Sequence, residues 1–148
     1  MDIIAIKHTD TLDLRQAVLR PHQKASELIY SGDTDDTSLH FGALVEEAIM
    51  GVISLYRTHC PNPNFSQPSY RIRGMAVRTQ AQGQGIGAAL LRHGEAKCLE
   101  KGANSIWCNG RVTASDFYLK HGYTKSGEPF EIEGIGLHYI MYKDLKAK

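Results

Sequence analysis

Hydrophobic and polar positions divide the chain into strand-like and helix-like stretches. Alternating or continuously apolar segments predict β-strands at residues 2–7, 39–45, 48–56, 70–77, 105–108, 123–126 and 137–142. Helical spacing predicts a short helix that Thr11 caps and Pro21 ends, a longer helix from Ile86 to Glu100, and a third that opens at the capping-box sequence of residues 113–116. Because strands come first and then alternate with helices, we expect an α/β (α+β) fold with a single mixed, mostly antiparallel sheet flanked by helices.

Composition and charge narrow the classes of partner. The chain has 148 residues, which we expect to form one domain over residues 1–148. Lys and Arg number 17 and Asp and Glu number 16, so the net charge of +1 argues against nucleic acid or an anionic membrane and favours a small ligand. No apolar run approaches the roughly 18 residues of a membrane span, and the first residues lack a signal-peptide pattern. We therefore expect a cytoplasmic protein.

The three cysteines, Cys60, Cys98 and Cys108, lack the pairwise spacing of zinc or redox sites. We expect three reduced thiols and no metal site. A nucleophilic Cys108 is the alternative, and it would be revealed by loss of activity on alkylation.

A glycine-rich segment carries the clearest chemical signal. Residues 82–87, with the sequence QGQGIG, lie between a predicted strand and a predicted helix. Backbone N–H groups at a helix N-terminus bind phosphate, and glycine lets the main chain approach the anion closely. A P-loop would need Lys and then Ser or Thr after its last glycine, but Gly87 is followed by two alanines. A dinucleotide-binding pattern fits Gly83, Gly85 and Ala88, although no acidic residue ends the next strand near residue 108.

Two segments resemble motifs of the GNAT superfamily of N-acyltransferases. In residues 82–87 the spacing Gln-x-x-Gly-x-Gly resembles the family's acyl-CoA-binding motif. Residues 114–123, with the sequence ASDFYLKHGY, look like the second motif, in which a helix bearing Ala and Phe-Tyr ends at a Gly-aromatic pair. Residues 134–145 are similar to the last strand of one branch of small members, so the resemblance covers residues 70–145. Where many members carry Asn, this chain has Arg111, with Asn109 nearby.

The resemblance implies that acetyl-CoA is the cofactor and that the glycine-rich backbone binds its diphosphate. The strand before this segment would pair with the pantetheine arm as an added strand would. Tyr118 matches the family Tyr whose hydroxyl lies near the cofactor sulfur, where it could protonate the departing thiolate; a packing role is the alternative. The implied cofactor-binding residues are Met75, Ala76, Val77, Arg78, Gln82, Gly83, Gln84, Gly85, Ile86, Gly87, Ala88, Asn109 and Tyr118.

The implied reaction is direct attack of an amine on the thioester in a ternary complex, with Tyr118 as one catalytic residue. An alkyl amine with a pKa of about 10.4 is mostly protonated at neutral pH, so a base is required. His138 is the favoured base because histidine titrates near pH 7. Glu131, Glu133 and His40 are the alternative bases, and they are also candidate residues for contact with the acceptor.

Few residues of the sequence indicate the chemistry of the acceptor. Arg71 and Arg73 share one face of a predicted strand and would attract an anionic group on the acceptor. We expect a small-molecule amine as acceptor, with neither nucleic acid nor membrane as partner, and the resemblance is compatible with a homodimer. Two other hypotheses stay open: a non-catalytic acyl-CoA-binding or sensor module, and a dinucleotide-dependent enzyme.

Overall fold

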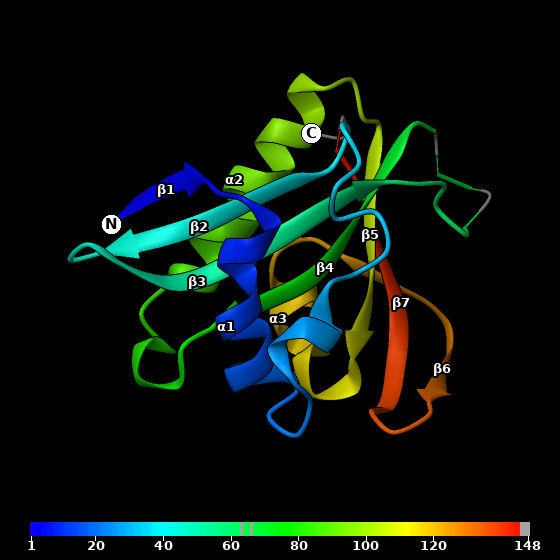
Figure 1. Ribbon diagram of the computed structural model, residues 1–148. Coiled ribbons are helices and arrows are strands. Elements are labelled where there is room, and N and C mark those ends of the chain that lie inside the picture. The colour runs from blue at the N-terminus through cyan, green and yellow to red at the C-terminus, as the bar shows by residue number, and fades with distance from the viewer. Residues whose placement is uncertain (63, 66, 146–148) are drawn as a thin grey trace. The chain divides into compact units, whose positions relative to one another are not determined.

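Seven strands form one mixed sheet in the part of the chain that the structure describes. The computed structural model describes residues 1–62, 64–65 and 67–145 (Figure 1). The strand order is β1-β2-β3-β4-β5-β7-β6. β4 and β5 pair in parallel, whereas the β1–β2, β2–β3, β5–β7 and β6–β7 pairs are antiparallel. The strands are β1 (Asp2–Ala5), β2 (Leu39–Val45), β3 (Ala48–Arg57), β4 (Ser69–Val77), β5 (Ser105–Arg111), β6 (Thr124–Ile132) and β7 (Gly136–Asp144). The predicted fold class is confirmed.

The helical segments are mostly short. The α-helices are α1 (Leu12–Leu14), α2 (Ile86–Glu100) and α3 (Ser115–Lys120). Single turns of 3-10 helix cover His8–Thr11, Ala25–Leu28, Thr79–Ala81 and Val112–Ala114, and a π-helical turn covers Arg15–Leu19. Among the described residues, no helix has both the length and the apolar character needed to cross a membrane.

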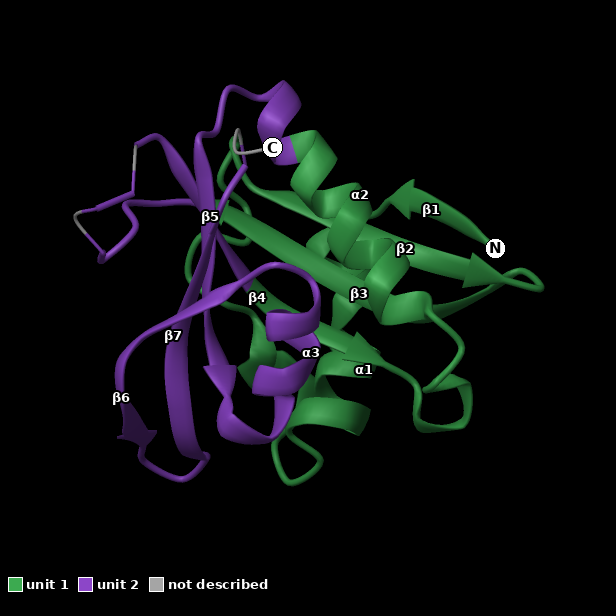
Figure 2. Ribbon diagram, turned by 180° about the vertical axis from the view of Figure 1, so that it is seen from behind, with its two compact units in different colours: residues 1–56, 73–97 green, residues 57–72, 98–148 purple. Residues whose placement is uncertain are grey.

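The chain divides into two compact units, which Figure 2 draws in different colours. The first unit comprises residues 1–56 and 73–97, and the second comprises residues 57–72 and 98–148. Residues 146–148, at the end of the predicted domain, lie outside the described residues. β4 belongs to both units, because residues 69–72 fall in the second and residues 73–77 in the first.

In the first unit, α2 packs against one face of the sheet, and the closest approaches are at glycine residues. A Cβ on Gly51 of β3 would be only 2.9 Å from side-chain carbons of both Ile86 and Leu90. Farther along the helix, a Cβ on Gly94 would be 3.0 Å from Cδ1 of Leu55. Because neither position carries a side chain, the helix packs closely on the strands, as the two opposite views in Figures 1 and 2 show.

The opposite face of the same unit is covered by the segment around α1 (Figure 1). Leu14, Val52 and Ala76 form a buried cluster there, and partly buried side chains pack around it. The cluster joins α1 to β3 and β4, so burial of apolar surface holds this short helix on the sheet. The hairpin of β2 and β3 turns at Glu46 and Glu47, which have φ values of 50° and 67°, a two-residue turn with the twist that hairpins favour.

In the second unit, α3 packs on β5 and β7. The rings of Tyr118 and Tyr123 lie 5.4 Å apart, and a Cβ on Gly110 would be 3.4 Å from both the Tyr118 ring and Met141. The ring of Phe65 lies 4.2 Å from that of Tyr142. Aromatic contacts therefore make up much of the packing of this smaller unit.

The predicted helix of residues 86–100 and the β2–β3 hairpin are confirmed, but the two predicted N-terminal helix caps are wrong. The first helical segment begins at His8, and the Thr11 hydroxyl donates to the His8 carbonyl at 2.5 Å instead of capping α1. In the predicted capping box, the Ser115 hydroxyl donates to the Val112 carbonyl at 2.8 Å, and α3 has no side-chain cap. In both places a hydroxyl inside the turn bonds back to the carbonyl three residues earlier, which competes with capping. Gly122, with φ of 92°, follows α3 as predicted.

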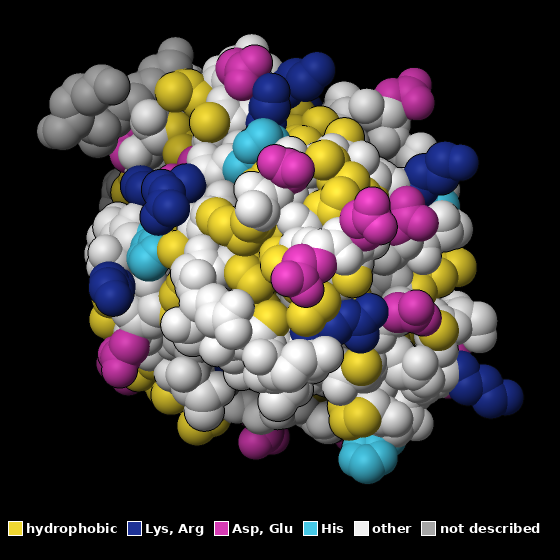
Figure 3. All heavy atoms as spheres, turned by 90° about the vertical axis from the view of Figure 1, so that its left-hand side faces the viewer, with side chains coloured by type: hydrophobic (Ala, Val, Ile, Leu, Met, Phe, Trp, Pro, Cys, Tyr) yellow, Lys and Arg dark blue, Asp and Glu magenta, His cyan; other side chains and the backbone are white. Residues whose placement is uncertain are grey.

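Charges of both signs share the molecular face drawn in Figure 3. Lys and Arg side chains are interspersed there with Asp and Glu side chains. Neither sign dominates this face, as the net charge of +1 suggests.

Candidate functional site

The glycine-rich segment is an exposed turn that leads into α2. After β4, the 3-10 turn Thr79–Ala81 is followed by exposed residues 82–85, and α2 begins at Ile86. Gly83 and Gly85 have φ values of 81° and 82°, a region that side chains rarely adopt, and a Cβ on either would meet nothing within 4 Å. Bare backbone therefore borders open space at the N-terminus of a 15-residue helix, where the helix dipole favours an anion.

Hydrogen bonds to neighbouring backbone hold this turn in place. The Arg78 N–H donates to the Met50 carbonyl at 2.8 Å, and Arg78 Nε donates to the Ile49 carbonyl at 3.1 Å. The Gln82 amide donates to the Val77 carbonyl at 3.0 Å. Arg78 and Gln82, two of the predicted cofactor-binding residues, thus hold the chain just before Gly83 against β3 and β4.

The remaining predicted cofactor residues of the first unit lie on either side of the turn. Ala76 is buried in the α1-side cluster, whereas Met75 and Val77 are half-buried on β4. Ile86 is buried against Gly51. Gln84 is exposed, and Gly87 and Ala88 are half-buried in the first turn of α2. These neighbours on β4, the turn and α2 belong to one continuous stretch of chain.

Tyr118, in the second unit, is buried and forms a hydrogen bond with a cysteine thiol. Its side chain is 7% exposed, and its hydroxyl donates to the sulfur of Cys108. Burial raises the pKa of Tyr118 well above its usual value, and the neighbouring thiol raises it further. Burial likewise raises the pKa of Cys108 to about 12. A thiol with that pKa is protonated at neutral pH, which argues against the nucleophilic Cys108 hypothesis.

The other predicted residues of the second unit lie on β5, β6 and β7 and in the turn between β6 and β7. His138 is 4% exposed, and its Nδ1 lies 2.8 Å from the Gly136 carbonyl. Glu131 lies near the end of β6 and Glu133 lies in the turn between β6 and β7, and both are exposed. Asn109 is half-buried on β5 and follows Cys108, so its side chain points to the opposite face of the sheet from the thiol.

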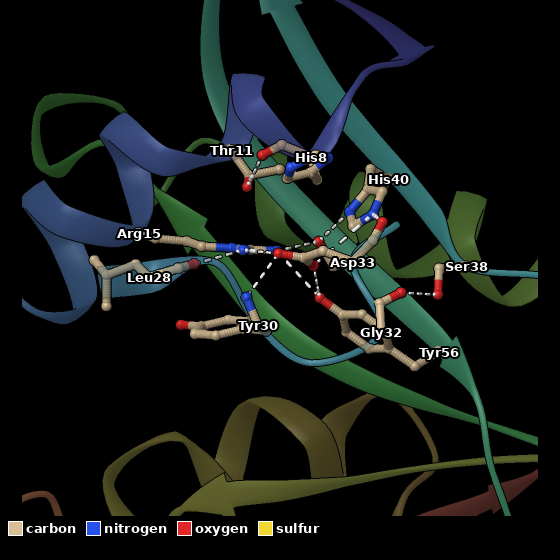
Figure 4. Close-up of polar contacts among 11 residues, drawn as sticks. His8, Thr11, Arg15, Leu28, Tyr30, Gly32, Asp33, Ser38, His40 and Tyr56 are labelled. Carbon is tan, nitrogen blue, oxygen red and sulfur yellow. Dashed lines mark hydrogen bonds and ion pairs between the residues drawn. The ribbon is translucent and has the colours of Figure 1, made fainter. Parts of the chain in front are cut away.

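A buried polar cluster in the first unit was not predicted (Figure 4). Arg15 is 0% exposed and Asp33 is 5% exposed; Arg15 Nη1 and Nη2 donate to the two oxygens of the Asp33 carboxylate at 2.7 and 3.1 Å. The hydroxyl of Tyr56 and the backbone N–H of Tyr30 also donate to this carboxylate. Arg15 donates further to the Leu28 carbonyl and to the hydroxyls of Ser54 and Tyr56. The cluster ties the segment of residues 28–33 to β3.

His40, a predicted acceptor-side residue, belongs to this cluster. Its Nδ1 lies 2.7 Å from Ser54 Oγ and its Nε2 lies 2.9 Å from the Asp33 carbonyl. Burial lowers the pKa of His40, which keeps the ring neutral at physiological pH. Both ring nitrogens are thus engaged within the protein.

Charge pairing dominates the electrostatics of the cluster. Burial acts to raise the pKa of Asp33, but the hydrogen bonds from Arg15 and Tyr56 outweigh it, so the pKa lies below its ordinary value. For Arg15, burial acts to lower the pKa, and the bond to Asp33 overcomes this and raises it. Asp33 and Arg15 are therefore both charged at neutral pH, as a buried ion pair.

Arg71 and Arg73, predicted to share a strand face, lie over different aromatic rings. The Arg71 guanidinium carbon lies 5.2 Å from the Trp107 ring centroid in the second unit. The Arg73 guanidinium carbon lies 3.9 Å from the Tyr30 ring centroid in the first unit. Between Arg73 and Met75, Gly74 has φ of 68°, which interrupts the regular alternation of β4.

Comparison with known proteins agrees with the predicted fold and the predicted family. A family model described as Acetyltransferase (GNAT) domain matches residues 15–145. The chain is 35% identical over 148 residues to the uncharacterized N-acetyltransferase YitI of Bacillus subtilis (strain 168), covering 99% of this chain and 98% of that protein.

Solved structures with low sequence identity share the fold. Escherichia coli ElaA has a TM-score of 0.78 at 15% identity, covering 97% of this chain and 99% of that one. An aminoglycoside 6'-N-acetyltransferase complexed with coenzyme A has a TM-score of 0.74 at 14% identity, covering 100% and 99%. From the match of the family model over most of the sequence and the identity to the B. subtilis protein, the chain belongs to the GNAT acetyltransferase family of enzymes.

Proposed function

We propose that the protein is an acetyl-CoA-dependent N-acetyltransferase that acts on an amine of a small molecule. The observation that carries the proposal is the bare, outward-facing backbone at Gly83 and Gly85, directly before α2. The family supplies the class of chemistry, and the B. subtilis relative is named an N-acetyltransferase. A solved structure with the same fold is named as a complex with coenzyme A, which supports an acyl-CoA as the donor.

The glycine-rich turn fits the diphosphate of coenzyme A. Its two glycines leave space that any side chain would fill, and the first N–H groups of a long helix lack partners within that helix. In the proposal, the N–H groups of residues 83–87 bind the diphosphate, with Gln84 and Ile86 contributing backbone only, and Ala88 follows them in the first turn of α2. Arg78 and Gln82 hold the turn through the bonds described above, and the backbone of residues 75–77 pairs with the pantetheine arm.

Acetyl-CoA, when bound, would supply a thioester: the amine nitrogen would bond to its carbonyl carbon, the carbon–sulfur bond would break, and one proton would leave nitrogen while one would join sulfur. Tyr118 is the proposed proton donor, because it matches the tyrosine of the family motif and a tyrosine hydroxyl carries its proton at neutral pH. His138 is the proposed base, and Asn109 is a proposed cofactor contact. A pH–rate profile of His138→Ala whose acidic limb is not shifted would exclude His138 from this role.

Glycine substitutions test the proposed diphosphate site. In Gly83→Ala/Gly85→Ala the added methyl groups occupy the space above the turn. Gly134→Ala is a matched control, because Gly134 also has positive φ, 79°, and open space around its Cβ but lies between β6 and β7. Loss of one charge-assisted hydrogen bond corresponds to about a 10- to 150-fold weaker Kd.

Calorimetric titration with coenzyme A is the measurement. We expect wild type and Gly134→Ala to bind with the same Kd and the double variant to bind at least tenfold more weakly. Equal binding by all three proteins would show that the diphosphate lies elsewhere. Binding of NAD in place of coenzyme A would favour a dinucleotide enzyme, and coenzyme A binding without thiol release for any amine class would favour the sensor hypothesis.

A further inference from the structure

The ring of Tyr30 is in contact with two guanidinium groups. The Cζ atom of Arg15 lies 4.1 Å from the ring centroid and the Cζ atom of Arg73 lies 3.9 Å from it. Both distances are within the range of cation–π contacts. All three residues belong to the first unit, Arg15 from the π-helical turn and Arg73 from β4. Two positive charges thus share one aromatic ring.

Among the residues that the structure describes, one of these two charges is paired with a carboxylate and the other is not. Arg15 is fully buried and paired through both terminal nitrogens with Asp33. Arg73 is half-exposed, and among the described residues no carboxylate lies within 4.0 Å of its guanidinium. The side chain of Arg73 therefore presents an uncompensated positive charge on a surface that solutes can reach.

The ring beneath Arg73 is held firmly. The Tyr30 N–H donates to the Asp33 carboxylate at 2.8 Å, so the ion pair that neutralises Arg15 also anchors Tyr30. The backbone of Gly74 packs directly against the same residues, since a Cβ there would be 3.2 Å from both Arg15 Nε and the Tyr30 ring. A stacked guanidinium loses less side-chain entropy on binding a ligand than a freely rotating one does.

We propose that Arg73, stacked on Tyr30, binds a carboxylate of the acceptor, and that the acceptor is therefore an amine that also carries a carboxylate. The inference rests on the proposed function. Arg73 precedes Met75 by two residues on β4, and residues 75–77 are the proposed partners of the pantetheine arm. The charged group thus lies close to the backbone where the acyl donor is proposed to bind.

A carboxylate suits this group better than a phosphate. The planar guanidinium can bind either anion through two parallel hydrogen bonds. Its single positive charge is balanced by the single negative charge of a carboxylate. A phosphate monoester, with close to two negative charges, would stay partly uncompensated beside the buried pair. The Arg73 guanidinium also disfavours simple polyamines as acceptors, because it repels their positive charges.

Matched acceptor pairs test the inference. Thiol release from acetyl-CoA is measured with amino acids and with the corresponding carboxamides, for wild type, Arg73→Gln, Arg73→Lys and Arg92→Gln. Arg92 is an exposed residue of α2, so its substitution removes the same charge from the same unit at another place. Coenzyme A binding by each variant reports separately on the donor site.

Wild type and Arg92→Gln are expected to prefer the acids to the carboxamides by about tenfold or more in kcat/KM, through KM. Arg73→Gln should lose this preference while its kcat/KM for the carboxamides stays unchanged, and Arg73→Lys should restore part of it. Equal use of acids and carboxamides by wild type, or an equal loss on both in Arg73→Gln, overturns the inference while the proposed function stands. Failure of wild type to bind coenzyme A overturns both.

Discussion

Replacing Asp33 by Ala is the sharpest test of how the first unit is held together. The substitution leaves the buried Arg15 guanidinium without its carboxylate, and it also removes the acceptor for the Tyr56 hydroxyl and the Tyr30 N–H. Breaking a buried ion pair by removing one partner typically costs about 3–5 kcal/mol. For a chain of this length, that loss corresponds to a fall in Tm of roughly 6–20 °C.

Two further variants separate charge from packing. Asp36→Ala alters an exposed carboxylate in the same loop and should leave the free energy of unfolding unchanged. Arg15→Met/Asp33→Leu removes both charges together and should recover much of the loss, because the desolvation of an unpaired ion is avoided. Urea unfolding followed by circular dichroism measures all three against wild type. A cost below about 1 kcal/mol for Asp33→Ala, or a double variant no more stable than the single one, would refute this account of the pair.

Acidification tests the same ion pair by another route. The pKa of Asp33 is lowered in the folded protein, so the charged carboxylate stabilises the fold above the unfolded pKa of about 3.9. That contribution is lost as the pH falls through the lower folded value. The difference in unfolding free energy between wild type and Asp33→Ala should therefore narrow below about pH 4. A difference that stays constant from pH 7 to pH 3 contradicts the assignment.

Two other substitutions address the chemistry and the packing. Tyr118→Phe removes the proposed proton donor and should lower kcat by about tenfold or more in steady-state assays of thiol release, with coenzyme A binding retained; an unchanged kcat excludes the role. Gly51→Ala places a methyl group 2.9 Å from side-chain carbons of Ile86 and Leu90 and should destabilise the fold by about 1–3 kcal/mol in urea titrations, and a stability equal to wild type would mean that α2 shifts freely.

The elements that follow local rules could be predicted from the sequence. The glycine-rich turn and α2 were predictable because glycine spacing, apolar periodicity and chain order all lie within about 20 consecutive residues. The turn conformation agrees, since both glycines flanking Gln84 have positive φ. The β2–β3 hairpin was predictable for the same reason, because two apolar strands are separated by only two polar residues.

The Arg15–Asp33 cluster could not be predicted from local pattern. Arg15 and Asp33 are 18 positions apart, and Arg15 and Tyr56 are 41 apart. Asp33 stands among other polar residues of a turn-rich segment, so nothing marks it as the one that is buried. The local signal in the sequence is a charged residue, Arg15, directly after the apolar Leu14 of the first predicted helix. Its burial is seen only in the structure.

The glycine contacts between α2 and the strands mean that the proposed diphosphate-binding end of the helix is positioned from a distance. Gly94 lies eight residues beyond Ile86, about 12 Å along the axis, and a helix behaves as a stiff rod over that length. Any residue that lifted the rod off the strands at Gly51 or Gly94 would tilt its first turn and move residues 83–87 with it. Substitutions at Gly51 or Gly94 are therefore expected to change the affinity for the proposed acyl-CoA donor, although neither residue belongs to the proposed diphosphate site.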